Sequence, residues 1–403
     1  MNTKRLSERY SEHYYFVKKY KGNGLYPYFR VITESSGTEV RVDGKNLLMI
    51  SSNDYLGLTH HEQVIARTSE MIKKFGTGTG GSRLLCGNLQ LHEQLEEQLA
   101  QFVGKKHAAV FPTGFTTNLG AISTMLTKDD MILFDRENHA SIFDACRLTQ
   151  AGMIPFTRNN VEQAVKKLKK ISSQAEQGIV MLITEGVFSM SGSVVDLPFF
   201  TQLKKHIPHL YIYLDDAHGL GTMGPGGHGV ASHFAAQDDV DFIMGTFSKS
   251  FASIGGFVAC NDPHIAQHLH HKSRTMVFSA ALPAGNVATV LASLDVLKNE
   301  PQHLARLWSN IACVRKGYQD IGLEIQPIAS PIIPINIGNE DQAILISHDL
   351  FDHNIFALPV IYPAVPRGKA IIRTSFMSTH SEDQLAYYLL TLRNVLKKHN
   401  IVH

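Results

Sequence analysis

Two short segments place a potentially reactive side chain directly after an apolar run. Residues 211–214 lead into Asp215, with His218 three positions further along. A second apolar run leads into residues 245–250, where Lys249 stands among glycine and hydroxyl residues. Such runs are typical of buried strands, and ligands of open α/β sheets bind at the carboxyl ends of strands. A lysine there can form a Schiff base, and a carboxylate there can hold a protonated ring nitrogen.

Lys249 and Asp215 are 34 residues apart (249 − 215), and their pairing is typical of enzymes that use pyridoxal 5'-phosphate (PLP). In these enzymes the lysine binds the cofactor, and the acid keeps the pyridine nitrogen protonated so that the ring accepts electrons. Each residue taken alone has a structural alternative, because Asp215 could cap a helix and Lys249 could lie on the surface. The pair together predicts a PLP site at a sheet edge.

A candidate phosphate site follows another apolar run, residues 108–111. After Pro112 come Thr113 and Gly114, and a helix is predicted to begin there. Backbone N–H groups at the start of a helix, together with a hydroxyl, can bind a phosphate group. The alternative is a capped helix without a ligand.

Two further motifs predict less than their residue types suggest. Residues 76–81 match GxGxxG, but they follow a predicted helix, whereas a dinucleotide-binding fingerprint follows a strand. We expect these glycines to allow a sharp turn or a close approach of the backbone. His268, His270 and His271 have no further ligand at a suitable spacing. We therefore expect a solvated helix face there and no metal site.

The composition predicts a globular chain of more than one domain. At about 150 residues per domain, 403 residues favour one large and one smaller domain. The content of 44% hydrophobic and 18% charged residues excludes a disordered chain or a small disulfide scaffold. A net charge of +2 gives no reason to expect a nucleic-acid partner. The four cysteines are scattered, as expected for reduced thiols in the cytoplasm, and neither a signal peptide nor a membrane span is expected.

The elements that position these residues follow from the pattern of apolar residues. We predict an N-terminal arm and hairpin over residues 1–50, with the hairpin turn at Asp43-Gly44. The arm is aromatic and basic, so it should pack on another subunit or on its own core, with a membrane surface as the alternative. Residues 51–285 should form a large α/β domain with a mostly parallel sheet. Residues 286–403 should form a smaller α/β domain, whose last helix begins with a capping box at Ser381. The strands expected in the large domain are 108–111, 131–134, 179–184, 210–214, 242–244 and 256–259.

Seven short motifs, taken in order, make the chain resemble the α-oxoamine synthases, a fold-type-I PLP family. This family includes serine palmitoyltransferase, 2-amino-3-ketobutyrate CoA ligase, 8-amino-7-oxononanoate synthase and 5-aminolevulinate synthase. The resemblance runs from about Tyr26 to the C-terminus. The motifs are NDYLG (53–57), GGSR (80–83), NHAS (138–141), EGVFSM (185–190), DDAH (215–218), GTFSKS (245–250) and SPIIP (330–334).

The resemblance implies a role for each matching residue. Lys249 should bind the cofactor, Asp215 should pair with its ring nitrogen, and His139 should stack on the ring. A second group should hold the rest of the cofactor, and a third should hold the substrate carboxylate. Ser189 and His218 should hydrogen-bond the phenolic oxygen of the cofactor, and Asn53 and Arg373 should bind the carboxylate of the amino acid. Ser279 should bind the phosphate in the neighbouring subunit. The residues that should bind the phosphate in their own subunit are Thr113, Gly114, Phe115, Thr246 and Ser248. The family resemblance also implies a homodimer.

The implied reaction is a decarboxylative condensation of an amino acid with an acyl-CoA or acyl-carrier-protein thioester. Serine is favoured by the similarity of residues 245–256 to bacterial serine palmitoyltransferases. The position near Ile361 is not basic, which leaves open the aminoketobutyrate ligases, 8-amino-7-oxononanoate synthases and synthases of long-chain ketone signals. Asp216 stands where related motifs often have glutamate, with little effect expected. Alternatives of another class are an aminotransferase and a non-catalytic partner subunit; such subunits lack the lysine.

Overall fold

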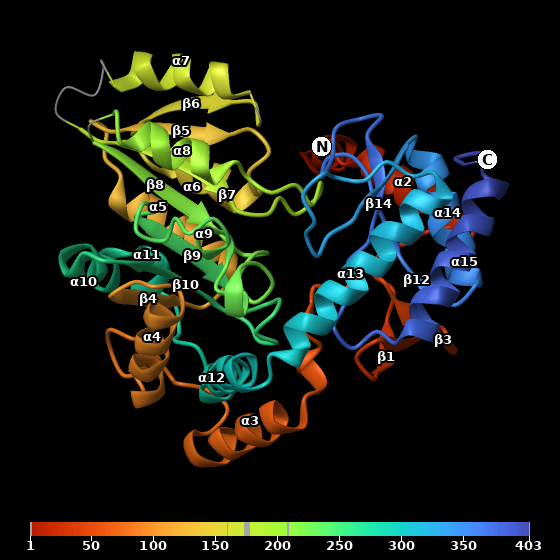
Figure 1. The fold of residues 1–403 in the computed structure, drawn as a ribbon, viewed down its shortest axis with the longest axis horizontal. Helices are drawn as coiled ribbons and strands as arrows, with labels where there is room; N and C mark the ends of the chain where they lie inside the picture. Colours follow the sequence, from red (N-terminus) through yellow and green to blue (C-terminus); the bar gives the residue numbers. More distant parts are fainter. Residues whose placement is uncertain (1, 159, 173–177, 208, 403) are drawn as a thin grey trace.

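The computed structural model describes residues 2–158, 160–172, 178–207 and 209–402. Its largest sheet has the strand order β4-β10-β9-β8-β7-β5-β6 (Figure 1). Neighbouring strands pair in parallel except β10, which runs antiparallel to β4 and β9. The predicted α/β fold with a mostly parallel sheet is therefore confirmed. The strands are β4 (His107–Phe111), β5 (Met131–Asp135), β6 (Gly152–Phe156), β7 (Val180–Glu185), β8 (Leu210–Asp215), β9 (Phe242–Thr246) and β10 (Gly256–Cys260).

Both faces of this sheet are covered by helices. Successive strand residues point to opposite faces, so Met181 and Tyr213 pack with α5, α6, α10 and α11, whereas Leu182 and Ile212 face α4, α7 and α8. This two-sided burial explains why the central strands are continuous apolar runs. The helices of this part are α3 (Glu62–Phe75), α4 (Gln90–Phe102), α5 (Gly114–Met125), α6 (Ala140–Leu148), α7 (Val161–Ser172), α8 (Leu197–Lys204), α9 (Val230–His233), α10 (Pro263–Lys272), α11 (Arg274–Val277) and α12 (Ala284–Asn299), with 3-10 turns η1 (Leu58–His60) and η2 (Pro225–Gly227).

A smaller α/β unit lies beside the large sheet (Figure 1). One of its sheets has the order β11-β14-β13, and the other has the order β1-β2-β3-β12, so the predicted N-terminal hairpin joins a strand from the C-terminal part. Ser381 caps the last helix in the predicted capping box. The elements are β1 (Ile32–Ser35), β2 (Glu39–Val42), β3 (Lys45–Met49), β11 (Ile335–Gly338), β12 (Ile355–Phe356), β13 (Leu358–Val360), β14 (Ala370–Arg373), α13 (Gln302–Ile321), α14 (Glu340–Asp352) and α15 (Glu382–Lys398).

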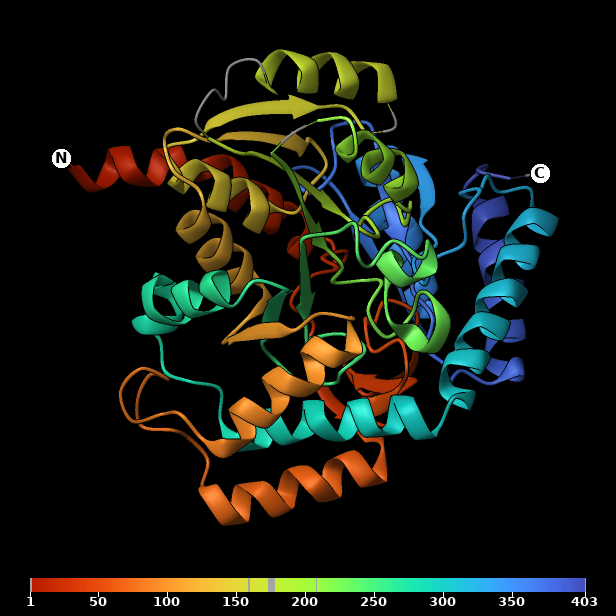
Figure 2. The ribbon, with the colours of Figure 1, turned by 60° about the vertical axis from the view of Figure 1, so that its left-hand side comes forward.

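The domain division at residues 50 and 285 stays a prediction. Two contacts cross it in space. Strand β3 pairs with β12, and α12 packs between α3 and α4 beneath the large sheet (Figure 2). From the end of α12 the chain passes directly through Glu300 and Pro301 into α13 of the smaller unit.

The N-terminal arm forms two helices, α1 (Asn2–Arg9) and α2 (Ser11–Gly22). Tyr20 is buried, its hydroxyl donates a hydrogen bond to the Asp341 carboxylate of α14, and Lys19 lies 3.6 Å from the same carboxylate. The arm therefore packs on its own chain, one of the two arrangements expected. Among the helices of the described residues, none is both long and apolar enough to cross a membrane.

Candidate active site

Asp215 and Lys249 lie at the carboxyl ends of neighbouring parallel strands. Asp215 is the last residue of β8 and is in register with Met244 of β9, and Lys249 follows β9. Lys249 opens into a cavity of about 930 Å³ between the large sheet and the smaller unit. The cavity brings together side chains from distant parts of the chain. Those predicted for the site that line it are Asn53, His139, Ser189, His218, Lys249 and Arg373.

The buried carboxylate of Asp215 is held by fixed hydrogen-bond donors. The side-chain amide of Asn118 donates to Oδ2 at 2.7 Å, and the backbone N–H of Ala217 donates to Oδ1 at 3.1 Å. Asn118 is itself oriented, because its carbonyl accepts the Tyr213 hydroxyl at 2.9 Å. A buried carboxylate that is held this firmly is suited to pair with a cationic ring nitrogen.

The environment of Lys249 favours its uncharged amine. Burial lowers the pKa of Lys249 to about 8, and Arg373 adds to this effect, whereas Asp215 and Glu185 oppose it. A lower pKa leaves more of the amine unprotonated near neutral pH. Since only the unprotonated amine attacks a carbonyl, this environment fits a Schiff-base lysine.

The backbone of His139 is held by a buried acid, Glu185, whose role was not predicted from the sequence. The His139 backbone N–H donates to Glu185 Oε1 at 2.5 Å, and its Nδ1 lies 2.8 Å from Ser141 Oγ. Glu185 ends β7 in register with Asp215, and burial beside Asp215 raises the pKa of Glu185 well above its usual value. Burial and then Lys249 lower the pKa of His139. The motif at 185–190 contained Glu185, but only the strand register shows its partners.

His218 is buried and is linked to a tyrosine that was not predicted. The Tyr55 hydroxyl lies 2.7 Å from His218 Nδ1 and 3.2 Å from Asn53 Oδ1. Burial lowers the pKa of His218 well below its usual value, followed by the effect of Lys249, so the ring is neutral at physiological pH. When Tyr55 donates to Nδ1, the Nε2 of His218 carries the proton and can act as a donor.

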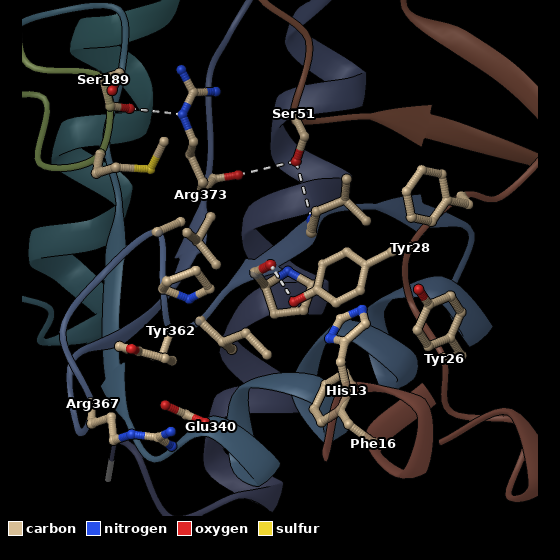
Figure 3. A pocket seen from close by; sticks show the side chains of 18 of the residues that line it. His13, Phe16, Tyr26, Tyr28, Ser51, Ser189, Glu340, Tyr362, Arg367 and Arg373 are labelled. Carbon is tan, nitrogen blue, oxygen red and sulfur yellow. Dashed lines mark hydrogen bonds between the residues drawn. The ribbon is translucent and has the colours of Figure 1, made fainter. Parts of the chain in front are cut away.

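Arg373 is the last residue of β14 and enters the cavity from the smaller unit (Figure 3). Its Nε donates to the Ser189 carbonyl at 2.8 Å, and its Nη2 donates to Asn53 Oδ1 at 2.9 Å. The Arg373 carbonyl in turn accepts the Ser51 hydroxyl at 3.0 Å. The structure thus brings together Asn53, Ser189 and Arg373, which the resemblance implied from separate parts of the sequence.

The predicted phosphate residues gather at the beginning of α5. A Cβ built on Gly114 would come 2.6 Å from Thr246 Oγ1, so the helix start and the end of β9 are in close contact only because this residue is glycine. Thr246 Oγ1 also lies 3.1 Å from Ser248 Oγ. The N–H groups of Gly114 and Phe115 belong to the first helical turn, which has no acceptors within the helix. The Thr113 hydroxyl accepts the Thr116 N–H at 3.0 Å, so it acts as the helix cap.

Residues 76–87 form a loop beside the segment that contains Ser279. The Ala281 N–H donates to the Gly81 carbonyl at 2.9 Å, which is the close backbone approach expected for these glycines. Ser279 itself is half-buried and does not line the cavity of this chain. Of the three clustered histidines, His268 and His271 are exposed as expected, but His270 Nε2 lies 3.0 Å from the buried Glu96.

The outer wall of the cavity comes from two segments that the sequence did not place near each other. One is the N-terminal arm with the residues that follow it, and the other is the segment from β13 to Arg367 (Figure 3). No periodic pattern signals this contact, since both segments are short and aromatic. Its members are Arg9, Tyr10, Glu12, His13, Phe16, Tyr26, Tyr28, Phe29, Leu358, Pro359, Val360, Ile361, Tyr362, Pro363, Ala364 and Arg367.

Comparison with known proteins agrees with this arrangement. The family model described as aminotransferase class I and II matches residues 45–392. A serine palmitoyltransferase of Bacteriovorax stolpii is 43% identical over 92% of this chain and 87% of its own length. That of Sphingobacterium spiritivorum is 40% identical over 100% and 99%. An 8-amino-7-oxononanoate synthase of Thermoanaerobacter pseudethanolicus is 34% identical over 96% and 97%.

A solved structure shows the same fold. Serine palmitoyltransferase from S. paucimobilis, with a bound PLP–myriocin aldimine, superimposes with a TM-score of 0.94 at 30% identity, covering 98% of this chain and 99% of the other. The similarity extends over both the large sheet and the smaller unit. The chain therefore belongs to the aminotransferase class I and II family and, within it, to the α-oxoamine synthases.

Proposed function

We propose that this protein is a PLP-dependent acyltransferase that condenses serine with a long-chain acyl thioester, releasing the carboxylate of serine as CO2. The observation that carries the proposal is the cavity itself. Its inner end combines Lys249, His139 and Arg373, and its outer wall is mostly aromatic and aliphatic, with Arg9, Glu12, His13 and Arg367 among its members. The relatives at 40–43% identity named serine palmitoyltransferase support the same reaction.

The donor set of the inner cavity fits PLP. Lys249 has a lowered pKa, Asp215 offers a buried carboxylate, and the start of α5 together with Thr246 offers donors for a phosphate group. Because Gly114 has no Cβ, the start of α5 can lie close to Thr246, so these donors face one small site. When bound, the cofactor supplies an electron sink for the carbanion at the α-carbon of the amino acid.

The residues of the chain would bind and orient the amino acid. Arg373 is a planar fork that pairs well with a carboxylate, and its bonds to Asn53 and the Ser189 carbonyl fix the direction of that fork. Glu185 holds the His139 backbone and Ser141 contacts its Nδ1, so the neutral ring can accept or donate a proton at its free nitrogen. His218 and Ser189 are placed to donate to an oxygen in the cavity.

The outer wall would bind the acyl chain. Phe16, Tyr26, Tyr28, Leu358 and Ile361 expose apolar surface to the cavity, and removing apolar surface from water favours binding. Each buried methylene contributes about 0.8 kcal/mol, or about fourfold in affinity. A wall of this kind therefore selects for acyl-chain length, whereas the inner end selects the amino acid.

An 8-amino-7-oxononanoate synthase activity is the second candidate, favoured by the 34% identical relative and by the non-basic Ile361 on the cavity wall. Titrating the cofactor absorbance with serine, glycine, alanine, threonine and 2-aminobutyrate separates the amino-acid choices. Turnover with acyl-CoAs of increasing length, assayed for CO2 and free CoA, then tests the condensation. Serine-dependent release of both products with a long-chain preference is expected; amino-group transfer without CO2 would contradict it.

We also propose a homodimer with shared sites. Leu84, Leu85 and Phe278 have 48%, 81% and 77% of their surface exposed around the loop of residues 76–87, where the half-buried Ser279 also lies. Mixing an inactive Lys249→Ala chain with an inactive Ser279 variant should restore activity, since one site of each mixed dimer is intact. A fully active monomer in sedimentation would contradict this. Four separate free thiols support a cytoplasmic location.

A further inference from the structure

A second group of chemistry-bearing side chains lies at the junction of α3, α12 and α13. His61 immediately precedes α3, Glu300 immediately follows α12, and His303 lies in the first turn of α13. One potential ligand atom from each residue lies within 4.8 Å of the other two. None of the three lines the active cavity.

Two separations within this group, one to each oxygen of Glu300, match those of neighbouring ligands around one cation. His61 Nε2 lies 3.4 Å from Glu300 Oε1, and His303 Nε2 lies 3.2 Å from Glu300 Oε2. Nitrogen and oxygen ligands at about 2.0–2.1 Å in a tetrahedral zinc site are about 3.3 Å apart. The Glu300 carboxylate is also held from the side, because the Gln302 side-chain amide donates to Oε2 at 3.2 Å.

Hydrogen bonding to Glu300 alone leaves both imidazoles incompletely satisfied. The Nδ1 atoms of His61 and His303 are buried and have no hydrogen-bond partner among the described residues. If both rings are neutral and donate from Nε2, both Nδ1 lone pairs lack a donor, which is costly for buried groups. A cation bound by the two Nε2 lone pairs fixes the tautomer, with the proton of each ring on Nδ1, and takes the place of the Nε2 contacts with Glu300.

The group has room for a water ligand and a path for an ion. A separate cavity of about 350 Å³ is lined by His61 and His303 together with Ser36, Gly37 and Thr379. His303 is 7% exposed, whereas His61 and Glu300 are half-buried, so protein encloses most of the group and its histidines face the cavity. Three protein ligands with an open fourth position are a common zinc arrangement.

We propose that His61, Glu300 and His303 bind one Zn²⁺ ion, with a water molecule as the fourth ligand. Two imidazoles and one carboxylate suit this borderline-soft ion better than Mg²⁺ or Ca²⁺, which prefer oxygen ligands. The ion links the beginning of α3 to the segment that connects α12 and α13. It thereby links the part of the chain around the large sheet to the smaller unit. Its effect is on stability, because the group lies outside the active cavity.

The test uses the full-length, cofactor-loaded protein after treatment with a chelator. Titration with zinc chloride in a calorimeter should show one high-affinity equivalent per chain, and zinc should raise the unfolding temperature, because an ion bound only by the folded state stabilises it. X-ray absorption should show nitrogen and oxygen neighbours at about 2.0–2.1 Å, without the sulfur distance of about 2.3 Å that exposed cysteines would give.

Three variants and one matched control locate the ion. His61→Ala, His303→Ala and the nearly isosteric Glu300→Gln should each weaken zinc binding at least tenfold and remove the thermal shift. His60→Ala is the control, since His60 lines the same cavity but its Nε2 contacts the Ser35 carbonyl. Circular dichroism tests whether each variant is folded. If a histidine variant is not folded, the zinc affinity of Glu300→Gln decides whether the ion binds here. Unchanged zinc affinity in the folded variants, equal loss in His60→Ala, or no stoichiometric binding would overturn the proposal.

Discussion

The two ends of the active cavity are built in different ways. At the inner end, Asp215, Lys249 and Arg373 follow or end strands, and the carboxylate and the guanidinium are each fixed by hydrogen bonds. The outer wall consists of side chains from the arm and from residues 358–367, among which Tyr10 and Phe29 are 66% and 93% exposed. The inner end has the fixed geometry that bond-making needs, whereas the outer wall offers apolar area to a substrate of variable length.

The largest effect is expected at the inner end. Lys249→Ala should remove essentially all turnover and the covalent link to the cofactor that borohydride makes permanent, because the cavity wall then lacks its nucleophilic amine. Mass spectrometry of the reduced protein measures the link. Lys128→Ala, at an exposed position, is the matched control and should keep both properties. A reducible link at another lysine of the variant would contradict the assignment of Lys249.

Arg373→Ala should separate the two ends of the cavity. Loss of a charge-assisted pairing costs roughly 1.5–3 kcal/mol, so serine should bind about ten- to a hundredfold more weakly. The KM for the acyl thioester should change little. Lysine at this position should not restore binding fully, because an ammonium group cannot form the planar fork.

Arg367→Ala is the counterpart on the outer wall. The Arg367 guanidinium lies 4.3 Å from the centre of the Tyr362 ring and 3.8 Å from the Glu12 carboxylate, and it is largely exposed. We expect a small change confined to the acyl thioester. Spectral titration measures the serine affinity of Arg373→Ala, and steady-state kinetics measures the KM of Arg367→Ala for the acyl thioester. If both variants changed the same parameter, the division of the cavity into two functions would be wrong.

The inner end was largely predictable from the sequence, because a strand followed by a reactive residue is a local pattern. Lys249 and Asp215 needed only that pattern and their spacing. Tyr55, Asn118 and Glu185 were missed because their roles depend on strand register and on contacts between distant segments. The outer wall was missed for the same reason. No motif connects an N-terminal helix with residues 358–367.

One strand of the large sheet was also missed. Strand β6 contains Gly152 and Pro155, residues that weaken the pattern of a strand. It lies at the edge of the sheet, where a proline is tolerated, and among the described strands it pairs with β5 alone. The arm was predicted without its helices. Few of its described residues are buried, Tyr20 among them, so no apolar stripe with helical spacing marks the helices in the sequence.

Phe16→Ala on the outer wall should have a smaller effect than Lys249→Ala or Arg373→Ala. Phe16 on α2 is half-buried and lines the cavity, so Phe16→Ala should raise the KM for long-chain acyl thioesters by about three- to tenfold, the cost of losing part of its apolar contact. Short-chain thioesters and serine binding should be affected less. Tyr14→Ala on the same helix is the control, since Tyr14 is 62% exposed and lies outside the cavity lining. A uniform loss at all chain lengths would contradict an acyl-binding wall.

The smallest effect on catalysis is expected at Asp216, the neighbour of Asp215 in sequence. Both are buried, but both carboxylate oxygens of Asp215 accept hydrogen bonds, whereas one oxygen of Asp216 does not. Its carboxylate is fully buried, Oδ2 accepts the Val230 N–H at 2.6 Å, and Oδ1 has no partner among the described residues. Cβ atoms built on Gly186, Gly219 and Gly229 would come within 2.4, 2.0 and 2.1 Å of its oxygens, so the space around it is full. Burial raises the pKa of Asp216 to about 7, and Asp215 adds to that rise.

This raised pKa gives Asp216 a predictable effect on stability. An unfolded aspartate has a pKa of about 3.9, so between about pH 4 and pH 7 the folded chain keeps a proton that the unfolded chain has lost. The contribution of Asp216 to stability therefore falls as the pH rises through this range. Asp216→Asn has no proton to lose and keeps an oxygen for Val230. Its unfolding temperature, compared with wild type, should increase from about pH 4 to pH 8, while Asp144→Asn, at an exposed position, should show no such trend. Because Asp215 carries the contact proposed for the cofactor ring, turnover should stay near wild type. A pH-independent loss of stability in Asp216→Asn would show instead that the ionised carboxylate is the form this glycine-lined space accommodates.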